Sequence, residues 1–185
     1  TTQAAAGRRS DVPPARKCHL LIVAIRPILQ YPHQALKSTN AAVAPSDPAV
    51  QAVVQDMLDT LAASPGVALA APQIGHAVQV IVGDVSRKKG ERGHGLVVLL
   101  NPVILSLEGK KSVREGCLSV PDYTGHVLRY EEALVEGMAP DGRVVTVSAS
   151  GFEALAFQHE VDHLNGMLFL DRIQSLSTDL FRRKK

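Results

Sequence analysis

The pentapeptide HEVDH at 159–163 constrains this chain more than any other segment, because its two histidines can act together only on a helix. Residues four apart on a helix project side by side, so two imidazoles at this spacing can chelate one ion. Ser150 and Glu153 have the spacing of a capping box, and Gly166 stands where a helix would end. The sequence therefore predicts a helix from about 150 to 165 that carries this motif.

One face of the predicted helix is apolar, and both histidines continue it. Its members recur at helical spacing: Phe152, Leu155, Ala156, His159 and His163. We expect this face to point inward, which would place the imidazoles around a buried ion and Glu160 beside it, within reach of a bound water. Two core histidines satisfied by hydrogen bonds are the structural alternative, and the helical context favours the metal.

An N-terminal helix is predicted at about 48–63. Asp47 is a favourable N-cap residue, Pro48 suits the first helical position, and Pro65-Gly66 ends the pattern. Between these signals lies an apolar stripe at helical spacing: Val50, Val53, Val54, Met57, Leu58 and Leu61. We expect this stripe to pack on the core.

The other regular segments are predicted as short strands, at 20–25, 77–82, 96–100, 133–138 and 144–148. Pro140-Asp141-Gly142 indicates a hairpin between the last two, and the charged, glycine-bearing stretch 84–95 indicates a mobile loop. The predicted fold class is α+β, with mostly antiparallel strands packed around the central H-E-x-x-H helix.

Size and composition indicate an ordinary globular protein. The chain has 185 residues, of which 45% are hydrophobic and 21% are charged, with a formal net charge of +2. This charge gives no reason to expect sequence-specific nucleic acid binding, and no apolar run suggests a membrane span. Residues 1–17, rich in Ala and Arg, are expected to form a flexible N-terminal segment or an organellar targeting remnant, and residues 18–185 a single catalytic domain.

A catalytic site of this kind holds its metal through about three protein ligands, so a third ligand is needed. Phe169 stands where a longer metalloprotease pattern has a histidine, and no glutamate follows the HEVDH motif. Asp171 and Asp179 are two possible third ligands. Cys117, the only cysteine after Cys18, offers a thiolate that borderline divalent ions accept, with a buried structural cysteine as its alternative.

The segment GVALAAPQ at 66–73 is rich in small residues, which let another backbone, such as that of a peptide, approach closely. Gln73 closes the segment with an amide that can donate to a developing oxyanion. Taken alone, the same residues also suit a tight, closely packed turn.

Together, three segments resemble the motifs of the peptide deformylases: GVALAAPQ (66–73), EGCLS (115–119) and QHEVDH (158–163). Their order and approximate separations match, and the similarity runs from about Ile25 to Arg172. The resemblance implies a metal-dependent hydrolase that removes the formyl group from N-formylmethionyl nascent chains, at the ribosome or free of it, and releases formate. Such an enzyme would act in a bacterial cytoplasm, or else in an organellar matrix or stroma.

The resemblance also implies roles for individual residues. The metal, natively Fe²⁺ with Zn²⁺, Ni²⁺ or Co²⁺ as substitutes, would be held by Cys117, His159 and His163. Glu160 would be the acid and base, while Gln73 and the Leu118 backbone N–H would stabilise the oxyanion. The substrate would be contacted by Gly66, Val67, Ala68, Arg129 and Ala156.

Two features depart from the family pattern. Ala68 stands where the first motif has its second glycine, which predicts a narrower approach for a substrate backbone. The chain ends soon after Phe181, so its C-terminus is expected to pack differently from members with a long C-terminal helix. An H-E-x-x-H endopeptidase and a structural zinc site closed by His126 or Asp171 are the competing interpretations.

Overall fold

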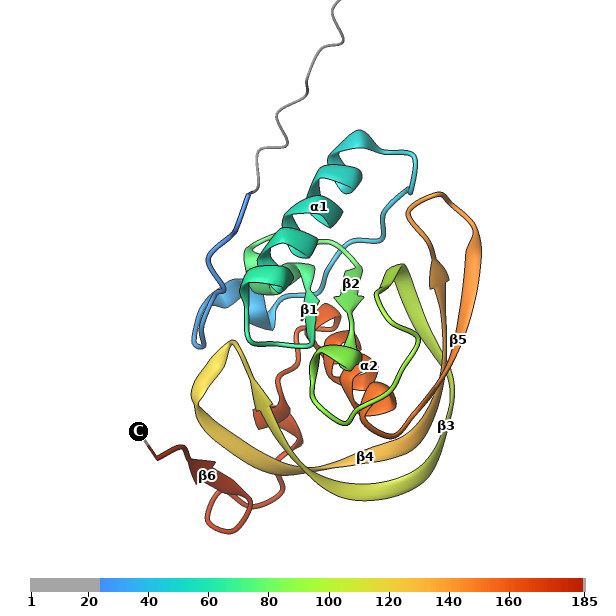
Figure 1. Cartoon of the computed structure of the whole chain (residues 1–185). Coiled ribbons are helices and arrows are strands. Elements are labelled where there is room, and N and C mark those ends of the chain that lie inside the picture. The colour runs from blue at the N-terminus through green and yellow to red at the C-terminus, as the bar shows by residue number, and fades with distance from the viewer. Residues whose placement is uncertain (1–23, 185) are drawn as a thin grey trace, which may run out of the picture.

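The computed structural model describes residues 24–184, which form a curved antiparallel sheet and two α-helices (Figure 1). The strands are β1 (Ala68–Ala70), β2 (Val80–Gly83), β3 (Val97–Cys117), β4 (Val120–Met138), β5 (Val144–Ser150) and β6 (Leu180–Arg182). They pair in the order β1-β2-β3-β4-β5, and β6 pairs with β4. The α+β class and the antiparallel pairing predicted from the sequence are confirmed.

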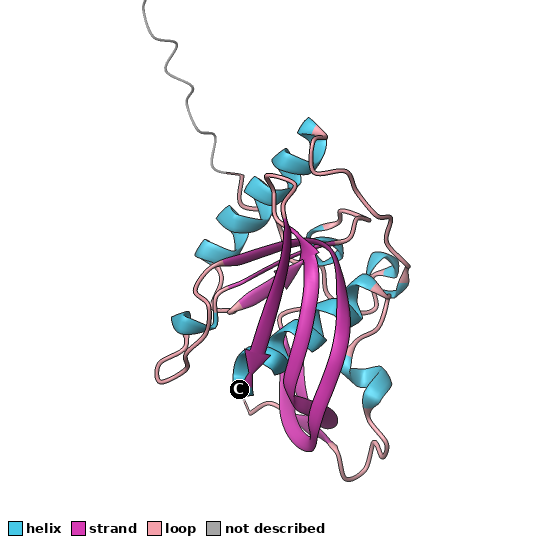
Figure 2. Ribbon diagram, turned by 90° about the vertical axis from the view of Figure 1, so that its right-hand side faces the viewer, coloured by secondary structure: helices cyan, strands magenta, loops and turns pink. Residues whose placement is uncertain are grey.

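The helices α1 (Pro48–Ala63) and α2 (Gly151–Leu164) pack on opposite faces of the short strands. Because successive side chains of a strand alternate in direction, Leu69, Val80 and Val82 meet α1, whereas Ala70 and Ile81 belong to the core beneath α2. Figure 1 shows α2 within the hollow of the curved β3, β4 and β5, and Figure 2 shows the long strands side by side along one flank.

The predicted N-terminal helix is confirmed in its bounds and in its cap. The Asp47 carboxylate accepts a hydrogen bond from the Ala49 backbone N–H at 2.8 Å, and Pro48 occupies the first turn. The predicted stripe is buried except for Leu58, which is half-buried: Val50, Val53, Val54, Met57 and Leu61. The stripe therefore does pack on the core, against β1 and β2.

The two strands predicted at 96–100 and 133–138 exist, but the observed strands β3 and β4 are much longer than predicted. β3 and β4 form one long hairpin, in which charged residues such as Glu108 and Lys111 hide the alternation expected of a half-buried strand. Register shifts between Leu100 and Val103 and between Ile104 and Ser106 interrupt this alternation further. The hairpin carries Cys117, the last residue of β3, to the edge of α2.

The predicted capping box of α2 is wrong, although the helix begins and ends close to the predicted positions. Ser150 is the N-cap residue but makes no side-chain hydrogen bond to the helix. The Glu153 carboxylate instead accepts from the His94 backbone N–H at 2.8 Å and lies 2.7 Å from the His94 ring Nδ1. The loop predicted at 84–95 does join β2 to β3, yet it is anchored here and buries Val85. Gly166 follows the helix with φ 68°, as a helix stop requires.

Two expectations concern the ends of the chain. Residues 1–17 lie outside the described residues, as does most of the strand predicted at 20–25, and Ala24 and Ile25 are not in a strand. At the other end, β6 pairs with Tyr123–Gly125 of β4. Neither α-helix of the described chain has the length and apolar character needed to span a membrane.

Candidate metal centre

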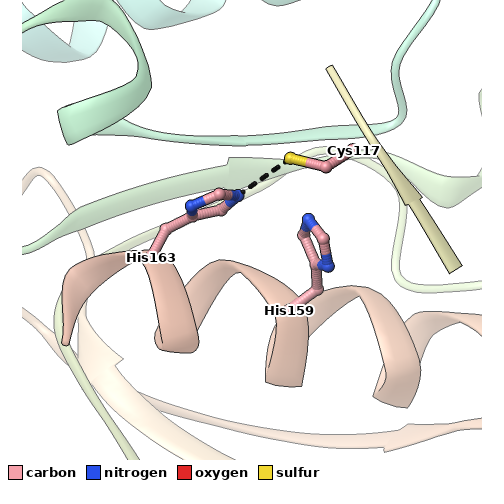
Figure 3. Close-up of side chains that lie close together, drawn as sticks. All are labelled: Cys117, His159 and His163. Atoms are coloured by element: carbon pink, nitrogen blue, oxygen red, sulfur yellow. Dashed lines mark hydrogen bonds between the residues drawn. The ribbon is translucent and has the colours of Figure 1, made fainter. Parts of the chain in front are cut away.

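Two histidines from α2 and one cysteine from β3 converge at one point (Figure 3). His159 and His163 lie one helical turn apart, with ring centroids separated by 4.9 Å. The Cys117 Sγ lies 3.2 Å from the His163 Nε2, and the ligand atoms of all three residues lie within 4.8 Å of one another. Helical spacing and the end of the long hairpin thus bring together the three predicted ligands.

The other ligands left open by the sequence lie elsewhere. The Asp171 carboxylate binds the Lys37 ammonium at 2.6 Å and the Leu168 backbone N–H at 2.7 Å. Asp179 accepts from the Ser175 backbone, and the His126 ring packs edge-on against Phe181. Within residues 24–184 the only metal-ligand cluster of three is the one around Cys117, so neither His126 nor Asp171 closes it as a fourth ligand.

The surroundings of these residues fit a divalent ion. The Cys117 sulfur accepts hydrogen bonds from the Gln73 Nε2 at 3.6 Å and from the Ser119 backbone N–H at 3.4 Å, so two donors fix its position. The His163 Nδ1 and a Glu160 carboxylate oxygen are buried without a partner among the described residues. One sulfur and two imidazole nitrogens make a donor set typical of zinc or iron.

A carboxylate behind the cluster orients one of the histidines. Glu115 Oε2 lies 3.0 Å from the Nδ1 of His159, which leaves the Nε2 of that ring for an ion. Burial alone would raise the pKa of Glu115, but its hydrogen bonds with His159 and Arg129 outweigh burial and lower that pKa to about 2. Glu115 is therefore ionised at neutral pH, beside the metal centre.

Arg129 does not reach the substrate cleft, so the expected contact with a substrate backbone is wrong. Its side chain is 1% exposed, and it donates to Glu115 at 2.6 and 3.0 Å and to Asp162 at 2.6 Å. The Arg172 guanidinium binds the same Asp162 carboxylate. Because buried charges are stable only when paired, Arg129 serves to position Glu115 and α2.

Glu160 has the environment of an acid and base. It is 4% exposed, and burial raises the pKa of its carboxyl to about 7. It also lines the cleft that opens on the cluster. A carboxyl whose pKa lies near neutrality can both accept and return a proton at working pH.

Two members of the cluster, Cys117 and His159, line a cleft of about 630 Å³, a size that suits a short peptide or drug-sized ligand. Besides Cys117, His159 and Glu160, six more of the predicted site residues line it: Gly66, Val67, Ala68, Gln73, Leu118 and Ala156. The apolar stripe of α2 also lines it through Phe152 and Leu155, which are half-buried. The stripe thus faces the cleft, whereas Ala154, Phe157 and Leu164 face the core.

The unexpected Ala68 is accommodated by a glycine on the neighbouring strand. Ala68 pairs with Gly83 of β2, and a Cβ at Gly83 would lie 3.3 Å from the Ala68 methyl. The methyl therefore occupies space that a side chain on β2 would fill. At Gly66 the constraint is different, because a Cβ there would lie only 2.7 Å from the Leu118 side chain.

Three residues of the site were not singled out from the sequence. Glu115 was detectable, because it precedes Cys117 by two residues on a strand and a metal-binding histidine needs an orienting carboxylate. Ser119 and Asp162 gave no such signal: the Ser119 hydroxyl accepts from Gln73 at 3.2 Å, and Asp162 pairs with arginines from distant segments. Those contacts depend on tertiary packing.

Comparison with known proteins points to one family. The profile described as polypeptide deformylase matches residues 25–179. A peptide deformylase of Syntrophobacter fumaroxidans is 42% identical over 162 residues, which cover 88% of this chain and 94% of that protein. A peptide deformylase structure from Legionella pneumophila aligns with a TM-score of 0.76 and 38% identity, covering 83% of this chain and 88% of that one. A Met-Ala-Ser-bound class I type b peptide deformylase from Acinetobacter baumannii aligns with a TM-score of 0.75 and 32% identity, covering 82% and 100%.

Proposed function

Because this chain belongs to the polypeptide deformylase family, we propose that it hydrolyses the formyl group from N-formylmethionyl peptides and releases formate. The observation that carries this proposal is the cluster of Cys117, His159 and His163, which meets a peptide-sized cleft through Cys117 and His159, with Glu160 beside them. Residues 18–185 would form one catalytic domain, with α2 as the central helix that carries the H-E-x-x-H motif.

One divalent ion would be held by Cys117, His159 and His163. We propose Fe²⁺ as the native ion, with Zn²⁺, Ni²⁺ or Co²⁺ able to replace it, since the donor set accepts all four. When bound, such an ion supplies a Lewis acid and lowers the pKa of water toward neutrality. The orientation of His159 by Glu115 supports this assignment.

The chain's own residues would move the proton and stabilise the developing charge. Glu160 accepts a proton from the attacking water and returns it to the departing amine, a role that its raised pKa supports. Gln73 is held by its own Oε1, which accepts from the Ala70 backbone N–H at 2.8 Å and fixes the direction of the Nε2 donor. With the Leu118 backbone N–H, this amide would stabilise the oxyanion; one such donor is typically worth about 3 kcal/mol.

The substrate would lie in the cleft, with its methionine side chain against Val67, Leu118 and Ala156. Gly66 and Ala68 would face its backbone, whereas Arg129 acts from below by holding Glu115. We propose that the substrate in the cell is a nascent chain at the ribosome. The bacterial source of the relatives supports the bacterial cytoplasm as the compartment, over an organellar matrix or stroma.

Formate release from formyl-Met-Ala-Ser tests the proposal, with a casein digest beside it to detect an endopeptidase. We expect formate and no casein cleavage. Glu160→Gln should keep its metal, because Glu160 is not a ligand, and should lose nearly all formate release. Glu131→Gln, at an exposed glutamate of β4, is the matched control. Formate release by Glu160→Gln at the rate of the unaltered protein would contradict the role assigned to Glu160.

A further inference from the structure

Three cationic side chains line the cleft beyond the metal centre: Lys88, Arg114 and Arg183. The Lys88 ammonium is already engaged, at 3.2 Å from a Glu91 carboxylate oxygen and 3.6 Å from the Phe152 ring centroid. In contrast, neither Arg114 nor Arg183 has a carboxylate partner within residues 24–184, although five ion pairs of other arginines occur there. The cleft therefore carries two arginine charges that the described chain does not neutralise.

Both arginines border the same point of the β3–β4 hairpin. The Arg114 Nε donates to the Thr124 hydroxyl at 3.0 Å, and its guanidinium lies 4.7 Å from the Phe181 ring centroid. Arg183, which follows β6, lies over Gly116, where a Cβ would collide with its guanidinium. Gly116 and Thr124 are paired across the hairpin, so the two guanidiniums are held near each other.

The position of this pair along the cleft indicates which part of a substrate it meets. The residues of β3 from Val113 to Cys117 all line the cleft, so the cleft follows the strand. Arg114 precedes Cys117 by three residues, a distance of about 10 Å at the rise of a strand. An extended peptide with its formyl group at the metal centre covers this distance with its second and third residues.

We propose that Arg114 and Arg183 form an anion-binding subsite. It favours substrates with Asp or Glu at the second or third residue, where the formylmethionine is the first. This inference rests on the proposed function. Two neighbouring guanidiniums repel each other, and a carboxylate between them relieves that repulsion while accepting their hydrogen bonds. Gly116 allows the close approach of Arg183, because any side chain there would displace it.

Formyl peptides with amidated C-termini test the subsite, since amidation removes the only other carboxylate. The pairs are formyl-Met-Glu-Ala-Ser against formyl-Met-Gln-Ala-Ser, and formyl-Met-Ala-Glu-Ser against formyl-Met-Ala-Gln-Ser. We expect kcat/KM to be about threefold higher for Glu than for Gln at one of the two positions, as exposed ion pairs allow. High salt should reduce that ratio.

Variants assign the preference to the two arginines. Arg114→Gln and Arg183→Gln should each bring the Glu/Gln ratio of kcat/KM close to one, whereas Arg183→Lys, which keeps the charge, should retain most of it. Arg182→Gln is the matched control, because Arg182 lies on β6 but does not line the cleft, and it should keep the full ratio.

Three outcomes would contradict the anion-binding subsite, and one of them would also contradict the proposed function. Equal kcat/KM for Glu and Gln at both positions would overturn the subsite while formate release still supported the proposed function. An equal rise for Glu and Gln peptides in Arg183→Gln would show that Arg183 obstructs the cleft, and would also overturn it. Absence of formate from every peptide would overturn both proposals.

Discussion

At the scale of single residues, Ala68 and Gly83 illustrate how one strand accommodates a change in its neighbour. The two residues pair across β1 and β2, and a second methyl at Gly83 would lie 3.3 Å from the first. We expect Gly83→Ala to lower the free energy of unfolding by about 1–3 kcal/mol through overpacking. Urea unfolding would measure this effect.

The double variant Ala68→Gly/Gly83→Ala supplies the control, because it keeps one methyl at the crossing. It should recover most of the stability lost in Gly83→Ala, so its loss should be smaller than the sum of the losses in the two single variants. A loss in the double variant equal to that sum would mean that the methyl groups do not meet.

The buried carboxyl of Glu160 makes the stability of the metal-free protein depend on pH. Its pKa is raised from 4.5 to about 7, so between these values the folded chain binds a proton that the unfolded chain does not. The free energy of unfolding should therefore fall as pH rises from about 4.5 to 7. Glu160→Gln has no carboxyl to ionise here, so above pH 7 this variant should be more stable than the unaltered protein by on the order of 1–3 kcal/mol.

Urea unfolding of the chelator-treated protein at pH 4.5 and pH 8 would measure this difference. The two proteins should unfold alike at the lower pH, where the carboxyl is protonated in both states. The exposed Glu131→Gln should follow the unaltered protein at both values. A Glu160→Gln variant that gains nothing at pH 8 would show that this carboxylate is not destabilised by burial.

The sequence predicted the positions of residues that follow from local spacing. His159 and His163, predicted from the helical period, lie together with Cys117, and Gln73, predicted from its place after a run of small residues, lines the cleft. Arg129 was given the wrong partner, because only the folded chain shows that it lies beneath α2 between two carboxylates. Pairing of buried charges is a tertiary property that no local pattern carries.

At the scale of elements, the position of α2 depends on the Asp162 carboxylate. Asp162 joins the helix to Arg129 on β4 and to Arg172 at the end of the short 3-10 helix η4 (Phe169–Arg172). Because its side chain is 6% exposed, Asp162→Asn would leave a buried arginine poorly neutralised. We expect a loss of about 3 kcal/mol in the free energy of unfolding.

Asp141→Asn is the matched control, since that carboxylate also binds an arginine but is 54% exposed. Its loss should be far smaller than that of Asp162→Asn, as is usual for surface ion pairs. Equal urea midpoints for the two variants would mean that the Asp162 network does not hold α2.

The elements themselves were predictable to different degrees. α1 has a cap, a proline at its first turn and a continuous apolar stripe, so its bounds followed from the sequence. β3 and β4 were shortened because much of the hairpin projects charged residues on a surface where neither face is fully buried. Strand pairing, which extends β3 to Cys117 and begins β4 at Val120, depends on a partner segment and not on local alternation.

At the scale of the whole molecule, the metal centre joins the end of the long hairpin to α2. Cys117 ends the long hairpin, whereas both histidines belong to α2. An ion that binds only the folded chain stabilises it in proportion to its affinity, by about 4 kcal/mol at a thousand times the dissociation constant. Removal of metal should therefore lower Tm as well as abolish formate release.

Thermal unfolding with Zn²⁺ and after chelation would measure this link, since Zn²⁺ avoids the oxidation that Fe²⁺ undergoes in air. The difference in Tm should shrink in Cys117→Ser, because a hydroxyl is a poorer ligand than a thiolate. It should persist in Ser177→Ala, an exposed serine outside the metal centre. If Zn²⁺ raised the Tm of Cys117→Ser as much as that of the unaltered protein, the ion would not join the hairpin to α2, and the fold would be held at this edge by the Glu115–Arg129–Asp162 network alone.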